Sequence, residues 1–314
     1  MRKLLKTLII IITMAPSISQ AQTDIDAIMM EKNQLCIGPM YSHSSWKKYW
    51  EGTMKRDNQN LGTVSTQLFS VMGAYGISPK LNLLFNVPYI KTNASAGTLH
   101  GMKGVQDFSF FVKYMPVEKQ LGPGTFSVYA IGGLSFPLTN YVADYMPLSI
   151  GMHSKTASAR LMLDYQINHI FFTGSATYTW RDNIKIDRTA YYTTEMHLTN
   201  EVEMPNANNF NFRAGYRSSK LIAEAVVNKS TTLGGFDISR NNMPFPSNKM
   251  DATVVGVNVK CVVTPDHKLS LVGGGNTTVA GRNVGQATTW YGSVFYILDF
   301  THKAKQTNNS GKTN

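Results

Sequence analysis

The chain lacks both a high content of charge and, beyond its N-terminus, any long apolar run. Charged residues make up 16% of its 314 residues, against about 25% in typical soluble proteins. No segment offers the roughly 20 consecutive apolar residues that a membrane helix needs. Hydropathy alone would therefore indicate a soluble protein. The strands of a membrane barrel give a much weaker signal per segment, so hydropathy does not exclude a membrane barrel.

Cysteine is also scarce, since the chain has only Cys36 and Cys261. Alternation places Cys36 on the same face as Gly38, and Cys261 on the opposite kind of face with Val259. The two cysteines fall in segments that are not expected to be neighbours, so we expect no disulfide between them. We interpret both as isolated small apolar residues.

Motifs for catalysis or metal binding are sparse. The nearest string to a lipid hydrolase site is Ser42-His43-Ser44-Ser45-Trp46, which has no Asn-Gly after it and no acidic or amide partner placed by sequence. The histidines are scattered without metal-ligand spacing. Gly273-Gly274-Gly275 is no phosphate loop, because no helix follows it. We expect no catalytic residue, no metal and no cofactor.

The N-terminus decides the compartment. Basic residues precede the apolar run 8–12, and Ser19-Gln20-Ala21 supplies the small residues of a cleavage site. This pattern predicts a secretory signal peptide over residues 1–21, because the apolar run is too short to span a bilayer. Residues 22–33 are expected to form a short periplasmic segment without a plug domain. Export, together with a net charge of +11 that is spread along the chain, argues against a nucleic-acid partner.

After residue 33, strands are joined alternately by short turns and long loops. Short turns are predicted near 78–79, 116–123, 168–169, 218–219 and 265–266, and the longer stretches between them are irregular. The predicted strands are 34–44, 61–76, 80–92, 104–115, 124–138, 156–167, 170–181, 208–217, 220–231, 250–264, 267–279 and 288–300. Bacterial outer-membrane barrels have an even number of strands, short periplasmic turns and long extracellular loops. We therefore predict an all-β fold, a transmembrane antiparallel β-barrel of about 12 strands over residues 34–300, with a polar disordered tail at 301–314.

The stretch NFNFRAGYRSSKLIAEAVV, residues 209–227, carries the alternation most clearly. Arg213 and Glu224 lie on one face, and the opposite face is apolar. In a soluble sheet the apolar face would be the core, whereas in a membrane barrel it faces lipid. Aromatic residues gather at both ends of the apolar rows, as membrane girdles do. They are Tyr41, Tyr89, Phe136, Trp180 and Trp290 towards the long loops, and Tyr114, Phe126, Tyr165, Tyr216 and Phe300 towards the short turns.

The same stretch predicts a pairing register. If Ser218-Ser219 is a two-residue turn, Arg213 stands directly opposite Glu224, and Arg217 opposite Lys220. Both charges of the Arg213–Glu224 pair then point into the lumen, where they avoid the cost of about 2–4 kcal/mol that Arg or Lys pays at the lipid midplane.

Eight charged residues are expected to face the lumen: Asp107, Lys113, Arg160, Asp164, Arg213, Glu224, Lys260 and Asp299. All of them except Asp299 are expected to line the path of a solute. These charges could order a solute along a pathway, or they could pair with one another and simply fill a narrow barrel. Phe111, Ile131 and Phe295 are expected to face inward as well. A mixed polar and apolar lining suits small, moderately hydrophobic solutes better than ions.

Two short stretches resemble a known family. In GVQDFSFFVKYMP, residues 104–116, Gly104, Asp107, Lys113 and Tyr114 match the pattern Gly-x-Gly-Asp-apolar-x-apolar-x-x-Lys-Tyr, with Gln106 in place of the second glycine. NVPYIK, residues 86–91, is similar to the Leu-Pro-Tyr element that precedes it. The family comprises outer-membrane barrels of the meta-cleavage (MetA) pathway of phenol degradation, distantly akin to fatty-acid and toluene channels. The resemblance implies passive passage of small hydrophobic or aromatic compounds.

These observations together predict a protein of the cell outer membrane, in contact with its lipid, that acts as a passive channel or transporter for a small hydrophobic or aromatic solute. A closed barrel with a structural or surface-interaction role is the alternative, and a membrane-embedded lipid hydrolase is the third reading. The sequence leaves the solute, the gating and the oligomeric state open.

Overall fold

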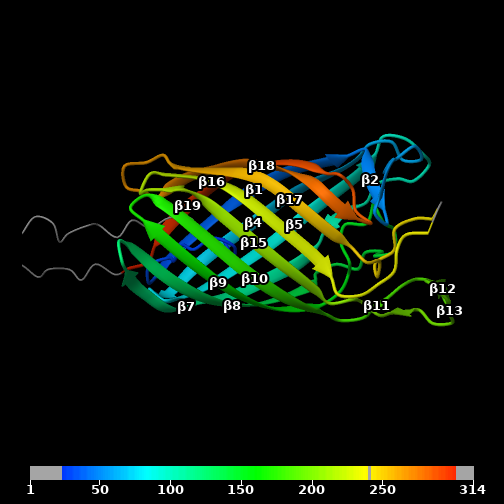
Figure 1. The fold of residues 1–314 in the computed structure, drawn as a ribbon, viewed down its shortest axis with the longest axis horizontal. Coiled ribbons are helices and arrows are strands. Elements are labelled where there is room, and N and C mark those ends of the chain that lie inside the picture. The colour runs from blue at the N-terminus through cyan, green and yellow to red at the C-terminus, as the bar shows by residue number, and fades with distance from the viewer. Residues whose placement is uncertain (1–22, 240–241, 302–314) are drawn as a thin grey trace, which may run out of the picture.

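The computed structural model of the protein describes residues 23–239 and 242–301 (Figure 1). The predicted signal peptide, 1–21, and the predicted tail after Thr301 lie outside the described residues. Within the described ranges, no helix is long and apolar enough to cross a membrane.

Twelve long antiparallel strands close into a barrel, since β4 pairs with β5 to join the two ends of the sheet (Figure 1). The predicted fold class is confirmed, and each predicted strand is present to within a few residues. The strands are β1 (Gln34–Trp46), β4 (Val64–Ser78), β5 (Leu81–Ala94), β7 (Asp107–Leu121), β8 (Gly124–Pro137), β9 (Thr156–Ile167), β10 (Ile170–Arg181), β15 (Ala207–Arg217), β16 (Leu221–Thr232), β17 (Asp251–Val262), β18 (Leu269–Arg282) and β19 (Thr288–Asp299).

The long loops contain short strands that the sequence did not predict. A three-residue strand, β6 (Lys103–Val105), extends the sheet beside β5. Three small hairpins stand at the loop end of the barrel, where Figure 1 labels several of their strands. They pair β2 (Lys48–Glu51) with β3 (Met54–Asp57), β11 (Ile184–Lys185) with β14 (Glu201–Val202), and β12 (Tyr191–Tyr192) with β13 (Met196–His197).

The outer wall of the barrel is apolar. Large apolar side chains alternate along the strands with buried ones, and Leu161 and Val257, for example, are 56% and 60% exposed. The girdle residues Tyr41, Tyr89, Phe136, Trp180 and Trp290 at the loop end, and Tyr114, Tyr216 and Phe300 at the turn end, are all exposed. Phe126 and Tyr165 are half-buried. Cys36 is buried and Cys261 is exposed, on opposite faces of the wall as alternation predicts, and the two form no disulfide.

The turn predicted over residues 116–123 is much shorter in the structure. Strand β7 continues to Leu121, and Gly122, at a positive φ of 59°, begins the turn to β8. Pro116 lies where the register between β7 and β8 shifts, between Tyr114 and Val117. Proline has no N–H to give to a ladder, so it is tolerated at such a bulge. The proline therefore marks an irregularity inside the strand and not its end.

The hairpin of β15 and β16 also differs from the prediction, because its turn is Ser219-Lys220. Ser218 stands opposite Leu221: its N–H donates to the Leu221 carbonyl at 2.8 Å, and its hydroxyl accepts from the Leu221 N–H at 3.2 Å. The register is therefore two residues away from the predicted one, and Glu224 is opposite Gly215. A shift of two keeps every side chain on its predicted face.

Asn283 joins three of the loops at the extracellular end. Its side chain is buried and makes four hydrogen bonds. The Nδ2 group donates to Asp237 Oδ1 and to the Lys249 carbonyl, both at 2.7 Å. The Oδ1 atom accepts the N–H groups of Gly52 at 2.8 Å and Ile238 at 3.1 Å. Arg282 adds an ion pair with Asp237. Loops far apart in the sequence are thus held together by one amide.

Candidate functional site

The lumen is the candidate site, and most of the predicted residues point into it. Lys113 is fully buried, and Asp164, Arg213, Glu224 and Lys260 are each less than 9% exposed. Such burial inside a barrel wall requires each charge to find a partner, because an unpaired buried charge is costly. The partners decide what each residue can do.

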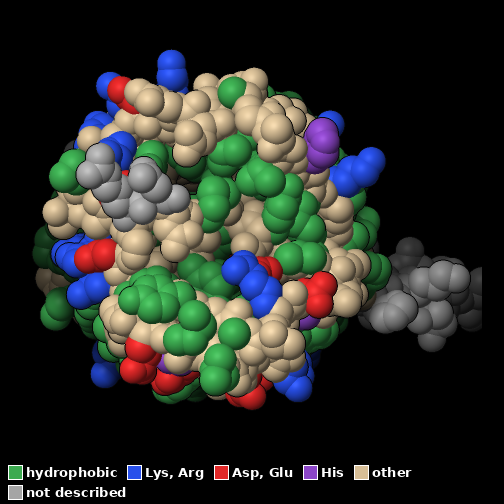
Figure 2. Space-filling model, turned by 90° about the vertical axis from the view of Figure 1, so that its right-hand side faces the viewer, with side chains coloured by type: hydrophobic (Ala, Val, Ile, Leu, Met, Phe, Trp, Pro, Cys, Tyr) green, Lys and Arg blue, Asp and Glu red, His purple; other side chains and the backbone are tan. Residues whose placement is uncertain are grey.

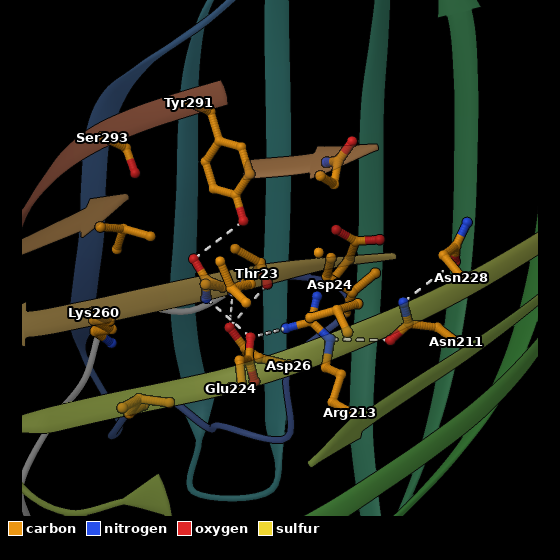
Figure 3. A pocket seen from close by; sticks show the side chains of 18 of the residues that line it. Thr23, Asp24, Asp26, Asn211, Arg213, Glu224, Asn228, Lys260, Tyr291 and Ser293 are labelled. Atoms are coloured by element: carbon orange, nitrogen blue, oxygen red, sulfur yellow. Dashed lines mark hydrogen bonds and ion pairs between the residues drawn. The ribbon is translucent and has the colours of Figure 1, made fainter. Parts of the chain in front are cut away.

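Arg213 and Glu224 form the centre of one polar network (Figure 3). Arg213 Nη1 lies 2.6 Å from Glu224 Oε1, and its Nε donates to Asn211 Oδ1 at 3.0 Å. Glu224 Oε1 also accepts from Asn258 Nδ2 at 2.9 Å, and Asn258 accepts from the Tyr291 hydroxyl at 3.2 Å. The predicted pair exists, but it spans the ladder diagonally because of the register shift. Removing one partner of such a buried pair typically costs about 3–5 kcal/mol.

A second network lies nearer the short turns, around Asp164. Arg217 Nη1 and Nη2 donate to the two carboxylate oxygens at 2.9 and 3.2 Å, which is a bidentate contact. Thr173 donates its hydroxyl to the same carboxylate. The guanidinium of Arg217 also lies 3.9 Å from the centre of the Phe171 ring. The prediction that Arg217 faces Lys220 is wrong, since Arg217 is opposite Ile222 and pairs with Asp164.

Lys113 binds the segment that precedes the first strand. Its Nζ lies 2.6 Å from the Asp26 carbonyl oxygen, 2.9 Å from that of Ile28 and 3.2 Å from that of Thr23. It also contacts Asp26 Oδ1 at 3.2 Å. The three N–H donors of this ammonium are thus shared among three backbone carbonyls and one carboxylate, and they fix the path of the segment inside the barrel.

Two further wall residues hold the same segment. Arg160 Nη1 donates to the Asp24 carbonyl at 2.6 Å and to its carboxylate at 3.0 Å. The Tyr129 hydroxyl donates to the Ala27 carbonyl at 3.0 Å. Met30, which is fully buried, packs into an apolar cluster of the wall. Residues 23–30 therefore lie within the lumen, whereas the sequence predicted a short periplasmic segment over residues 22–33. We call residues 23–30 the lumen segment.

The lumen segment separates two cavities. The upper cavity has a volume of about 650 Å³, and its lining includes Arg160, Arg213, Glu224 and Lys260. Five asparagines add amide groups, and apolar side chains fill much of the remaining surface: Met40, Met72, Ile222, Val226, Val254, Val272 and Phe295. Figure 3 shows Asp24 and Asp26 in the same space as Arg213 and Glu224. The lower cavity, about 740 Å³, lies towards the short turns and is lined by Asp164 and Arg217.

Asp107 does not join these networks. It starts β7 at the loop end, where its Oδ1 accepts a hydrogen bond of 2.6 Å from the Tyr141 hydroxyl. The same hydroxyl accepts the His153 N–H at 2.8 Å. Burial and the bond to Asp107 raise the pKa of Tyr141 in its loop. Among the predicted residues, Asp107 and Lys113 thus line neither cavity.

Sequence reasoning missed Asp24, Asp26 and Arg217 as lumen residues. A signal was present, because two wall carboxylates, Glu224 and Asp164, pair with two of the inward cations, and other cations remain. The inward cations are Lys113, Arg160, Arg213, Arg217 and Lys260. A buried surplus of positive charge needs carboxylates from elsewhere. Asp24 and Asp26, which precede the first strand, supply two such carboxylates.

The hydrolase reading has no support from the first strand. Ser42 lines the upper cavity, whereas the His43 ring lies 5.5 Å from the Trp290 ring, which is 53% exposed on the outer wall. The two side chains point to opposite faces of β1 and cannot act together. Within residues 23–239 and 242–301, no cluster of His, Cys, Asp or Glu could hold a metal ion.

Several solved structures of outer-membrane proteins resemble this barrel to different degrees. The COG4313 outer membrane channel from Pseudomonas putida F1 has a similar structure, with a TM-score of 0.70 at 12% identity over 88% of this chain and 99% of that chain. The NanC porin gives a TM-score of 0.46 at 9% identity over 82% of this chain and 98% of that chain. A FadL homologue of Pseudomonas aeruginosa gives 0.35 at 10% identity, over 87% and 91%. A search of curated proteins finds no match.

At such low identity the first structure shows a shared fold, and the other two are weak likenesses. The family match is stronger, because the sequence profile of the family described as "Putative MetA-pathway of phenol degradation" matches residues 64–291, more than half of the chain. The expected resemblance and the expected outer-membrane location are both confirmed. The chain belongs to this family of outer-membrane barrels.

Proposed function

We propose that the protein is a passive outer-membrane channel for small hydrophobic or aromatic solutes, which bind in the upper cavity on their way through the lumen. The composition of that cavity carries the proposal. Arg213 is paired with Glu224 and Arg160 with Asp24, and apolar side chains of the lining are left to meet a solute. A cavity that is mostly apolar, with a few placed polar groups, suits a small organic molecule.

The volume and the amides refine the class of solute. A cavity of about 650 Å³ has room for one small aromatic molecule and some water. Asn258, Asn228 and Tyr291 can offer a hydrogen bond to a hydroxyl or carboxyl group on such a ring. Among the predicted residues, Arg213, Glu224, Arg160 and Lys260 would supply the charged part of the lining around the solute, while Lys113 would hold the lumen segment in place.

A matched pair of variants tests the proposal. Val226 lines the upper cavity, whereas its neighbour Val227 faces lipid and is 43% exposed. Val226→Trp is expected to lower single-channel conductance and to weaken its block by a small aromatic carboxylate. Val227→Trp adds the same volume on the lipid side, where tryptophan is well tolerated, and is expected to leave both unchanged. Equal behaviour of the two variants would contradict a pathway through the upper cavity.

The alternative of a closed barrel rests on a different observation. Loops pack over the extracellular end, with an apolar cluster around Ile184, Tyr191 and Val202. Figure 2 views this end and shows loop side chains of every kind across it. If the folded wild-type protein gives no conductance steps at all, the barrel is closed, and the loops become the functional surface.

A further inference from the structure

We propose that the outer wall carries a binding site for the phosphorylated headgroup of a glycolipid, of the lipid A type that forms the outer leaflet of a Gram-negative outer membrane. The site is formed by Lys91 of β5 and Lys103 of β6, above the aromatic side chains of Phe69 and Tyr89. It lies on the lipid-facing surface and is separate from the lumen and from the proposed channel function.

Both lysines point outward at the extracellular end of the barrel. Lys91 is exposed, and Ile90 and Thr92 on either side of it are buried. Lys103 is exposed as well, and a Cβ on its neighbour Gly104 would meet the buried Ile150, so Gly104 faces inward and Lys103 outward. Alternation along each strand therefore places the two ammonium groups on the lipid side.

The two lysines stand directly opposite each other across the ladder between β5 and β6. A pair of like charges in this position destabilises a sheet. The strands β4, β5 and β6 contain no Asp or Glu, and within the described parts of the chain neither lysine forms an ion pair with a carboxylate. An anion held between the two ammonium groups would remove the repulsion.

The surroundings of the lysines match the layers of a phosphorylated glycolipid. Two residues towards the membrane, Tyr89 and Phe69 are 42% and 51% exposed and face each other across β4 and β5. Aromatic side chains at this depth lie at the boundary between acyl chains and headgroups. Gln67 is opposite Lys91, and Asn93 follows it towards the loops, so amide groups are available for sugar hydroxyls. Lysine is a good partner for the phosphates between these layers.

Lys229 supplies a comparison on the other side of the barrel. It is exposed and faces outward on β16, opposite Thr253 of β17. Asp251 lies two residues from Thr253 on the same face, the diagonal position to Lys229. A carboxylate within reach of a lysine reduces its attraction for a phosphate. Lys229 is therefore a lipid-facing lysine at which we expect no such site.

Native mass spectrometry of the folded, detergent-purified protein with bisphosphorylated lipid A tests the proposal. Lys91→Gln/Lys103→Gln is expected to weaken binding about 25-fold, from about fivefold for each basic residue near an anionic lipid surface. Lys229→Gln is expected to bind as the wild type does. Equal affinity of the wild type and the double variant would overturn the proposal.

Two further measurements separate a phosphate site from general adhesion of lipid. Lipid A stripped of its phosphates is expected to bind the wild type as weakly as intact lipid A binds the double variant. If the wild type bound stripped and intact lipid A with the same affinity, the acyl chains alone would decide the binding and the proposal would be overturned. Inorganic phosphate is expected to displace lipid A poorly. Effective displacement at the same phosphate concentration would show a simple anion site to which the aromatic residues add nothing, and this would overturn the assignment to a lipid.

Thermal unfolding gives an independent readout. Without lipid A, the double variant is expected to unfold at a higher temperature than the wild type, because the like-charge pair is gone. On addition of lipid A, the unfolding temperature of the wild type is expected to rise more than that of the double variant, since a ligand stabilises the folded state that binds it. An equal gain in both proteins would count against the site, whatever the conductance of the barrel.

Discussion

Replacing Lys113 by methionine is expected to release the lumen segment. The substitution keeps much of the side-chain length but removes the ammonium group that contacts the carbonyls of Thr23, Asp26 and Ile28 and the Asp26 carboxylate. Loss of one partner of a buried ion pair costs about 3–5 kcal/mol. The lower figure corresponds to an increase of about 150-fold in the population of a released segment. Arg160 and Tyr129 still hold Asp24 and Ala27, so the variant is expected to shift the equilibrium towards the released segment and not to abolish the bound one.

Thiol labelling measures that population. Ala27 is 7% exposed within the lumen segment, and Ala27→Cys, in a background without the two native cysteines, reports its access to a water-soluble maleimide. We expect labelling in Lys113→Met to be about a hundredfold faster than in the wild-type background. Mean conductance is expected to rise in parallel, because the segment separates the two cavities.

Two control variants accompany this experiment. Lys229→Met removes an outward lysine and is expected to leave the labelling rate unchanged. Lys113→Met/Asp26→Asn also removes the carboxylate left behind, so its rate is expected to fall between those of the wild type and the single variant. If Lys113→Met labels at the wild-type rate in a barrel with normal heat-shifted gel mobility, Lys113 does not hold the segment and the reasoning is refuted.

Three further predictions concern single contacts. Arg213→Ala is expected to lower the free energy of unfolding by about 3–5 kcal/mol, whereas Arg213→Met/Glu224→Leu should recover most of the loss; urea titration of the refolded barrel measures both, and additive losses would exclude coupling. Asn283→Ala should speed hydrogen exchange at the N–H groups of Gly52 and Ile238, which donate to the Asn283 side chain, by at least about tenfold. The amides of the strands should keep their protection. Hydrogen bonds from Arg282 lower the pKa of Asp237. The contact should therefore stabilise its loop fully above about pH 4, the range of an unfolded carboxyl group, and this stabilisation should be lost as the pH falls through the lower folded pKa. Hydrogen-exchange protection of the loop, corrected for the intrinsic exchange rate, measures the loss. Asp237→Asn should show no such pH dependence.

The hairpin of β15 and β16 shows how far local patterns reach. Alternation placed Arg213 and Glu224 on the inner face, and the structure agrees. The register was wrong by two residues, because the hydroxyl of Ser218 takes part in closing the turn at Ser219-Lys220. A period of two fixes the face of a side chain but leaves registers two residues apart equally compatible with it.

The short turn at Gly122 gives the same lesson for strand ends. Pro116 looked like the end of a strand, since proline cannot donate to a ladder. The structure places it at a shift in register within β7. A bulge and a turn have similar local sequence signals, and only the position of the neighbouring strand distinguishes them.

The sequence by itself determined the strands, their facing and the apolar outer wall, because each depends on residues one or two positions apart. Only the tertiary structure decided that the lumen is occupied. Lys113 meets Asp26 across 87 positions of the sequence, and Asn283 reaches Gly52 across 231. No periodicity encodes such contacts. They arise because closing the barrel buries several cations, and the carboxylates of Asp24 and Asp26 pair with two of them inside the lumen.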